Sequence, residues 1–135
     1  MSEFNISVAF ETRLNTLSPA VATAYENVNY TPVTGTPYQK VNLLPAQPEN
    51  NTLGSSYYRE VGLFQIGLYY PMNTGRGAAQ ARAQALKAHF KRGTVMTANG
   101  QTVRVIRTPQ VSPSQIIGDR YFIAVSIFYR SEVFS

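Results

Sequence analysis

The sequence predicts a single α+β domain, in which two α-helices pack on one face of a single, mainly antiparallel or mixed β-sheet. Its length of 135 residues suits one domain with a real core and is too short for two domains of usual size. A hydrophobic fraction of 44% is typical of a globular chain. The predicted elements follow the order helix, strands, helix, strands, which favours an α+β arrangement over alternating βα units.

The first predicted helix covers residues 3–17, because apolar side chains recur there at spacings of four, four and three: Ile6, Phe10, Leu14 and Leu17. Residues 25–31 are predicted to form a short strand and residues 38–44 its partner strand, with a proline-bounded turn between them. Residues 45–56 are polar and contain two prolines, so they predict a long loop.

The central stretch, residues 57–93, predicts a long strand, a glycine-containing turn and a second helix. Apolar residues occupy both alternating sets of positions from Val61 to Tyr70, which favours a central strand covered on both faces. Pro71 ends this strand, and residues 72–77 supply turn residues and a Thr or Asn that can cap the next helix. That helix is expected over residues 77–92, with Gly93 in the left-handed conformation that stops it.

The second helix divides into three faces at ~100° per residue. One is an apolar stripe that we expect to pack on the sheet: Ala79, Ala83, Leu86 and Phe90. Beside it runs a polar stripe: Gln80, Gln84, Lys87 and Lys91. Opposite the core stripe lie four alanines: Ala78, Ala81, Ala85 and Ala88. These alanines either serve helix propensity alone or form a candidate subunit interface, where small side chains let another subunit come close.

After the second helix, Asn99-Gly100 is a strong hairpin signal, because both residues tolerate the positive φ angles of a tight turn. It predicts a hairpin of residues 94–98 and 101–108. Residues 109–119 are predicted to be a second long loop, and residues 121–129 the last strand, beside the central one.

The net charge of +5 is unevenly distributed. No Asp or Glu occurs from Val61 through Gly118, whereas the same stretch carries seven basic residues: Arg76, Arg82, Lys87, Lys91, Arg92, Arg104 and Arg107. They form a candidate basic surface for DNA or an acidic partner, or else a solvated face that keeps the protein soluble. Zinc-finger spacing, basic-region heptads and the aromatic–basic signature of an RNA-binding sheet are all missing from the sequence.

Catalytic signals are weak. The chain has no cysteine, which excludes disulfides, a thiolate nucleophile and cysteine metal sites. His89 is the single histidine, and its spacing to Asp119 and the serines does not indicate a triad. The seven carboxylates show no metal-like cluster, and the Gly75-Arg76-Gly77 turn lacks the rest of a nucleotide-binding fingerprint. We therefore expect no enzyme, no catalytic residues, no metal and no cofactor.

The N-terminus has no charged-then-apolar leader, and no run of about 18 apolar residues occurs, so we expect neither export nor a membrane partner.

Several short motifs occur in a definite order along the chain: Ala24 to Pro32 (AYENVNYTP), Gly35-Thr36-Pro37-Tyr38, Leu44-Pro45-Ala46, Gly62 to Ile66 (GLFQI), and Pro71 with Gly75 and Gly77 before the alanine-rich helix. In order and spacing they resemble the tail terminator, or tail completion, proteins of long-tailed bacteriophages. The resemblance covers most of the chain, from the first helix to the last strand.

The resemblance implies a structural virion protein, assembled in the host cytoplasm, that forms a ring, commonly a hexamer, at the head-proximal end of the tail tube. There it stops tube polymerisation and provides the head–tail joining surface. Its implied partners are further copies of itself, the tail tube protein and the head connector, with a contact to passing DNA as an option. The family has no catalytic residues to carry over. The alternatives are a basic nucleic-acid-binding domain and another ring component of the tail or neck.

Overall fold

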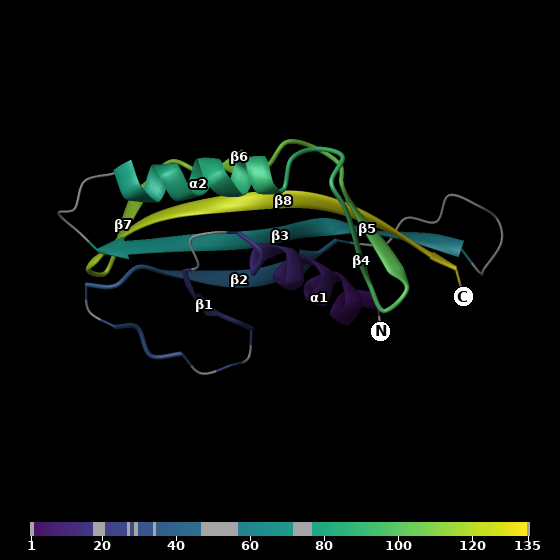
Figure 1. Ribbon diagram of the computed structural model, residues 1–135, viewed down its shortest axis with the longest axis horizontal. Helices are drawn as coiled ribbons and strands as arrows, with labels where there is room; N and C mark the ends of the chain where they lie inside the picture. Colours follow the sequence, from purple (N-terminus) through teal and green to yellow (C-terminus); the bar gives the residue numbers. More distant parts are fainter. Residues whose placement is uncertain are drawn as a thin grey trace.

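A computed structural model (Figure 1) describes residues 2–17, 21–26, 28, 30–33, 35–46, 57–71 and 77–134. These residues form two helices, α1 (Ser2–Leu14) and α2 (Gly77–His89). They also form eight strands: β1 (Ala22–Ala24), β2 (Tyr38–Pro45), β3 (Tyr57–Pro71), β4 (Val95–Ala98), β5 (Gln101–Val105), β6 (Gln110–Val111), β7 (Gln115–Ile117) and β8 (Arg120–Phe134). The strands make one sheet of order β1-β2-β3-β8-β5-β4, with β6 and β7 also paired to β8. All described pairings are antiparallel except that of β1 with β2, so the predicted α+β class with a mixed sheet is confirmed.

The sheet is built around two long strands. β3 and β8 pair along their whole length, from Tyr57 opposite Phe134 to Pro71 opposite Arg120, and Figure 1 shows them side by side as the teal and yellow ribbons. The predicted position of the last strand beside the central one is confirmed. The strand is longer than the predicted 121–129, because its pairing with β3 continues to its C-terminal end.

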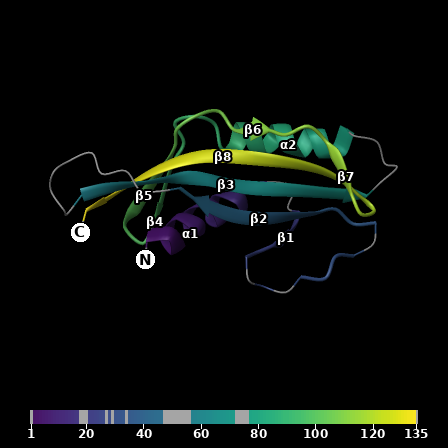
Figure 2. The ribbon, with the colours of Figure 1, turned by 180° about the vertical axis from the view of Figure 1, so that it is seen from behind.

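Both helices cover the same face of the sheet. Phe64 and Ile66 of β3 lie opposite Ile127 and Val125 of β8, and all four side chains are buried. Their alternate positions define one face. The buried residues of the helices, including Phe10 of α1 and Leu86 of α2, belong to the same core cluster. Figure 2, seen from behind, places the strands in front of both helices.

The prediction of a strand over residues 25–31 is wrong. The strand in this region is β1, three residues earlier, and it runs parallel to β2 rather than forming a hairpin with it. The ring of Tyr30 packs against the ring of Tyr38, with centroids 5.2 Å apart. The aromatic side chain of Tyr30 therefore packs onto the sheet, although Tyr30 itself does not belong to a strand.

The prediction of a loop over residues 109–119 is also wrong in part. β6 and β7 lie within it and pair with β8, and a turn at Gly118 and Asp119 connects β7 to β8. Gly118 has φ of 61°, as a tight turn requires. Prolines indicated a loop here, but strands of two and three residues fit on either side of Pro113.

The remaining local predictions are close to the structure. The Asn99-Gly100 turn has φ angles of 51° and 80° and joins β4 to β5, which ends at Val105 rather than at residue 108. Gly93 has φ of 91°, as predicted, but α2 already ends at His89, and α1 ends at Leu14 instead of residue 17. Residues 72–76 of the predicted 72–77 turn and residues 47–56 of the predicted first loop lie outside the described residues. Gly77 is the first residue of α2, and Pro45 is the last residue of β2.

Candidate subunit interface

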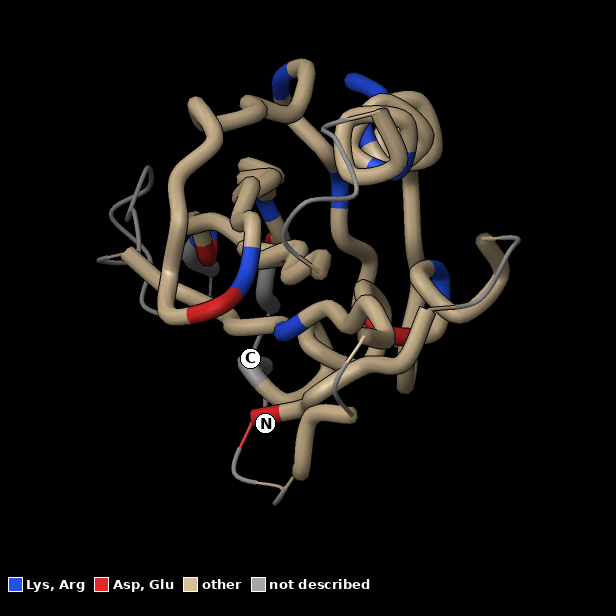
Figure 3. The backbone as a smooth tube through the Cα atoms, turned by 90° about the vertical axis from the view of Figure 1, so that its left-hand side faces the viewer, with Lys and Arg blue, Asp and Glu red and all other residues tan. Residues whose placement is uncertain are grey.

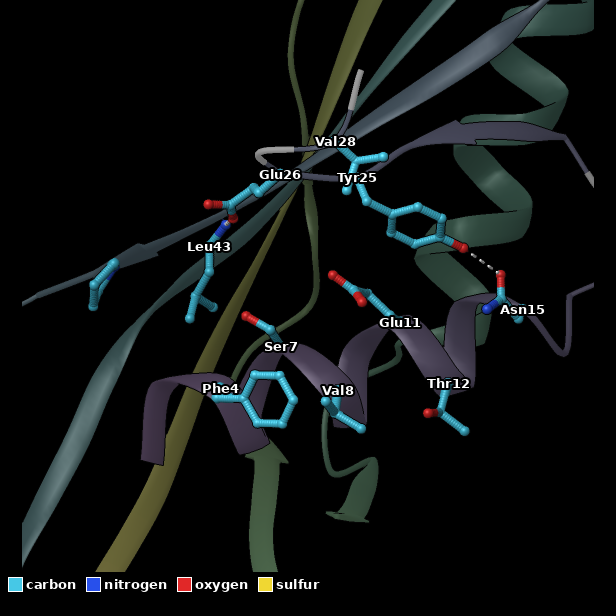
Figure 4. Close-up of a pocket in the computed structure, with 11 residues that line it drawn as sticks. Phe4, Ser7, Val8, Glu11, Thr12, Asn15, Tyr25, Glu26, Val28 and Leu43 are labelled. Atoms are coloured by element: carbon cyan, nitrogen blue, oxygen red, sulfur yellow. Dashed lines mark hydrogen bonds between the residues drawn. The ribbon is translucent and has the colours of Figure 1, made fainter. Parts of the chain in front are cut away.

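An open groove runs between the outer side of α1 and the strand edge beside it, with a cavity volume of about 750 Å³. Five residues of the helix and the residue that follows its end form one wall: Phe4, Ser7, Val8, Glu11, Thr12 and Asn15. The segment after β1 and the end of β2 form the other wall: Tyr25, Glu26, Val28, Leu43 and Pro45. In Figure 4, Ser7 and Glu11 point from the helix toward the second wall, whereas Val8 and Thr12 project from the other side of the helix.

The groove exists because α1 carries two stripes. Ile6, Phe10 and Leu14 point into the core, whereas Phe4 and Val8 lie on the opposite side of the helix and line the groove. Sequence analysis identified the core stripe and missed the second one. Its signal was two apolar residues spaced by four outside the core stripe, which is one turn of a helix.

Glu26 is fixed on its wall by the backbone of β2. The amide of Leu43 donates a hydrogen bond to the Glu26 carboxylate, just beyond the point where β1 stops pairing at Ala24 opposite Lys40. The carboxylate thus accepts the hydrogen bond that a backbone carbonyl would accept if β1 continued beside β2. On the same wall, the Tyr25 hydroxyl donates to Asn15 Oδ1 across the groove at 3.2 Å.

Two acidic residues, Glu11 and Glu26, line the groove from its two walls. Burial raises the pKa of Glu11 above its usual value, and the nearby charge of Glu26 raises this pKa further. Figure 4 shows Glu11 directed from α1 toward the segment that carries Tyr25 and Glu26. Two carboxylates on facing walls favour a cationic occupant over an anionic one.

The four alanines of the candidate interface lie where the helix periodicity predicts. Ala78, Ala81 and Ala88 are exposed, and Ala85 is half-buried. The opposite stripe of α2, including Ala79, Ala83 and Leu86, is buried against the sheet. The alanine face is therefore open to another molecule, and its role as an interface stays a prediction.

The basic residues do not form one surface. Lys91, Arg92, Arg104 and Arg107 are exposed and Lys87 is half-buried, whereas Arg76 lies outside the described residues. Val105 pairs with the core residue Tyr129 and Arg104 with Arg130, so Arg104 points to the sheet face away from the helices. Lys87 belongs to α2, on the other face. Figure 3 likewise shows Lys and Arg on α2 and on several strands rather than in a single patch.

Arg82 does not belong to the surface. It is only 6% exposed, and its Nη2 donates to Gln39 Oε1 of β2 at 3.3 Å. Burial lowers the pKa of the Arg82 guanidinium, and the neighbouring Tyr70 partly offsets this effect. The inclusion of Arg82 in the basic surface is corrected accordingly: a buried amide oxygen holds this arginine over the sheet.

His89 joins the two helices. Its Nε2 donates to the carbonyl oxygen of Arg13 at 2.7 Å, and the Arg13 Nε donates to the carbonyl oxygen of His89 at 2.9 Å. Asp119 lies in the turn between β7 and β8. Within the described part of the chain, no group of three or more His, Cys, Asp or Glu side chains is arranged to hold a metal ion. No helix among the described residues is both long and apolar enough to cross a membrane.

The chain is similar in sequence to a protein family and in fold to a solved structure. A family model described as phage tail terminator protein matches residues 5–129, which include α2, α1 from Asn5 onward and almost the whole sheet. The chain is also similar to a solved structure whose title states no function, with 26% identity, a TM-score of 0.78 and coverage of 100% of this chain and 99% of the other. The search of curated proteins found no match.

Proposed function

Because this chain belongs to the phage tail terminator protein family, we propose that it forms a ring, a hexamer, at the head-proximal end of the tail tube. The ring ends polymerisation of the tube and presents the surface to which the head connector binds. The protein acts in the virion tail as a structural part, with no catalytic role, and is assembled in the host cytoplasm. Its partners are further copies of itself, the tail tube protein and the connector.

The observation that carries this proposal is the family match over residues 5–129. The geometry supports it, because a cyclic ring needs two different complementary patches on each subunit. We assign these two patches to the groove beside α1 and to the outer side of α2, which are made of different elements. The candidate interface of Ala78, Ala81, Ala85 and Ala88 lies on the second patch.

The decisive experiment follows the growth of purified tail tubes by light scattering and negative-stain microscopy, with and without stoichiometric amounts of this protein. We expect the protein to stop elongation and to appear as a ring at one tube end. Tubes that continue to grow in its presence would contradict the proposal. A ring that binds without changing tube length would instead indicate another ring component of the tail or neck.

The second candidate is a basic nucleic-acid-binding role, and the observation in its favour is the acid-free end of α2. Lys87 and Lys91 lie there with Arg92, all at least partly exposed. This candidate predicts affinity for duplex or single-stranded DNA that falls steeply with salt. Charge reversal at Lys87, Lys91 and Arg104 that leaves DNA binding unchanged would remove it.

A further inference from the structure

The groove beside α1 exposes apolar surface next to negative charge. Phe4 and Val28, on its two walls, are 61% and 62% exposed. Large apolar side chains left in water at the rim of a groove gain free energy when a partner covers them. A partner that brings a cation also offsets the charges of Glu11 and Glu26, which lie on the two walls of the groove.

The outer side of α2 has the complementary chemistry. Lys87 lies in the last turn of α2 and Lys91 follows the helix end by two residues, where it is exposed. No acidic residue occurs anywhere between Val61 and Gly118. The exposed neighbours of these lysines include Ala81 and Ala88, whose small side chains allow the helix axis to approach a surface closely. Arg104 is a poorer match, because it lies with Glu132 of its own chain around a separate cavity on the other sheet face.

The two surfaces lie on opposite sides of the subunit. Figures 1 and 2 both show α2 along one side of the β3–β8 pair and β1 and β2 on the other side. A contact between unlike patches on opposite sides repeats from copy to copy, and it closes into a ring when the rotation per copy allows. Contact between two like patches would stop at a dimer.

We infer that the groove between α1 and β2 receives α2 of the neighbouring copy, with Lys87 and Lys91 of one subunit facing Glu11 and Glu26 of the next. The inference rests on the proposed ring and specifies which surfaces form it. The apolar walls cover the alanine side of the incoming helix, and the charges set its register and exclude other pairings.

Because the native chain contains no cysteine, any disulfide must form between introduced cysteines, which allows a direct test. In the double variant Thr12→Cys/Gln84→Cys, one thiol lies on the groove wall and the other on α2, both at exposed positions. Oxidation of assembled rings should give a ladder of covalent oligomers on a denaturing gel. The control Thr12→Cys/Thr102→Cys, with its second thiol on the outward side of β5, should give no ladder beyond the background of the single variants.

A charge exchange tests the pairing itself. Glu11→Lys or Lys91→Glu alone should raise the concentration at which rings half-form by about tenfold or more, since like charges meet at every contact. A mixture of the two single variants should assemble again within about threefold of the unmodified protein, because an alternating ring restores opposite charges at each contact. Arg104→Glu, with the same charge change as Lys91→Glu, should have no comparable effect.

The outcomes separate the two proposals. Rings that form normally but give no cysteine ladder, or that tolerate both single reversals, overturn this inference and leave the proposed function standing. If the unmodified protein forms rings neither in solution nor on tubes, the proposed function fails and this inference fails with it. If circular dichroism shows that Glu11→Lys does not fold, the cysteine ladder decides the question.

Discussion

The ring of Phe10 in α1 lies flat on the ring of Phe64 in β3, with centroids 4.6 Å apart and an interplanar angle of 6°. Phe10 also meets Phe90 after α2 at 5.8 Å and the edge of Tyr129 in β8 at 5.7 Å. One side chain therefore touches the region after α2 and both long strands. Phe10 therefore helps attach α1 to the sheet.

Replacing Phe10 with alanine should lower the free energy of unfolding by about 3–5 kcal/mol, because the side chain is fully buried and leaves a cavity. Phe4→Ala is the matched control on the same helix, since Phe4 is 61% exposed; its effect should stay within about 0.5 kcal/mol. Urea unfolding followed by circular dichroism measures both values. Equal losses for the two variants would mean that α1 does not pack through Phe10.

Gly62→Ala should destabilise the fold by about 1–3 kcal/mol. A Cβ at Gly62 would lie 2.6 Å from the carbonyl oxygen of Leu44 and 2.8 Å from the Cα of Pro45, both backbone atoms that cannot rotate away. Gly77→Ala is the control, because a Cβ there meets nothing within 4 Å and alanine suits the first turn of α2. Thermal unfolding should separate the two variants, and a neutral Gly62→Ala would contradict the tight approach of β2 to β3.

Glu11→Gln should stabilise the subunit at pH 7 and not at pH values below 4.5. Burial, and then the charge of Glu26, raise the pKa of Glu11 in the folded state above its ordinary value of 4.5. The folded state therefore binds a proton more tightly than the unfolded state, and stability falls as the pH rises from 4.5 through the raised pKa. Unfolding midpoints at pH 4 and pH 7 check this prediction. A gain of the same size at both pH values would show that charge is not its cause.

Ala85→Glu should leave the subunit folded and weaken its self-association, provided that the alanine face is an interface. A glutamate there adds bulk, and if the neighbouring groove is the partner it also adds repulsion toward Glu11 and Glu26. Ala85→Lys adds similar bulk with the opposite charge and should weaken association less. Mass determination across a concentration series, with tube ends present, compares the three proteins. If both variants assemble as the parent does, the alanines serve only the helix.

Sequence reasoning located the elements that carry their own local signal. The apolar run of β3, the periodicity of α2 and the Asn99-Gly100 turn each act over a few residues, and all three lie where predicted. β6 and β7 have only two and three residues and are defined by the β8 backbone beside them, so composition alone pointed to a loop. The strand expected over 25–31 failed for a similar reason, because Tyr30 packs on Tyr38 from outside the ladder.

Of the two surfaces in the candidate interface, sequence analysis identified the alanine face and missed the groove. Helix periodicity placed the alanine face correctly, since it depends on α2 alone. The groove was missed because it requires α1 and the segment around Glu26 to lie side by side, which is a tertiary relationship. Arg82 was assigned to the surface for the same reason, since nothing near it in sequence shows that Gln39 accepts its hydrogen bond.

The carboxylate of Glu26 on the Leu43 amide also limits how copies of this protein can join. A sheet whose outer strand offers a row of unused backbone groups can recruit strands from other molecules and grow into fibres. Here β1 takes the first part of that row, at residues 38–40, and a side chain takes the next donor. Another copy therefore cannot add a strand along this part of β2, and a contact made here must use side chains.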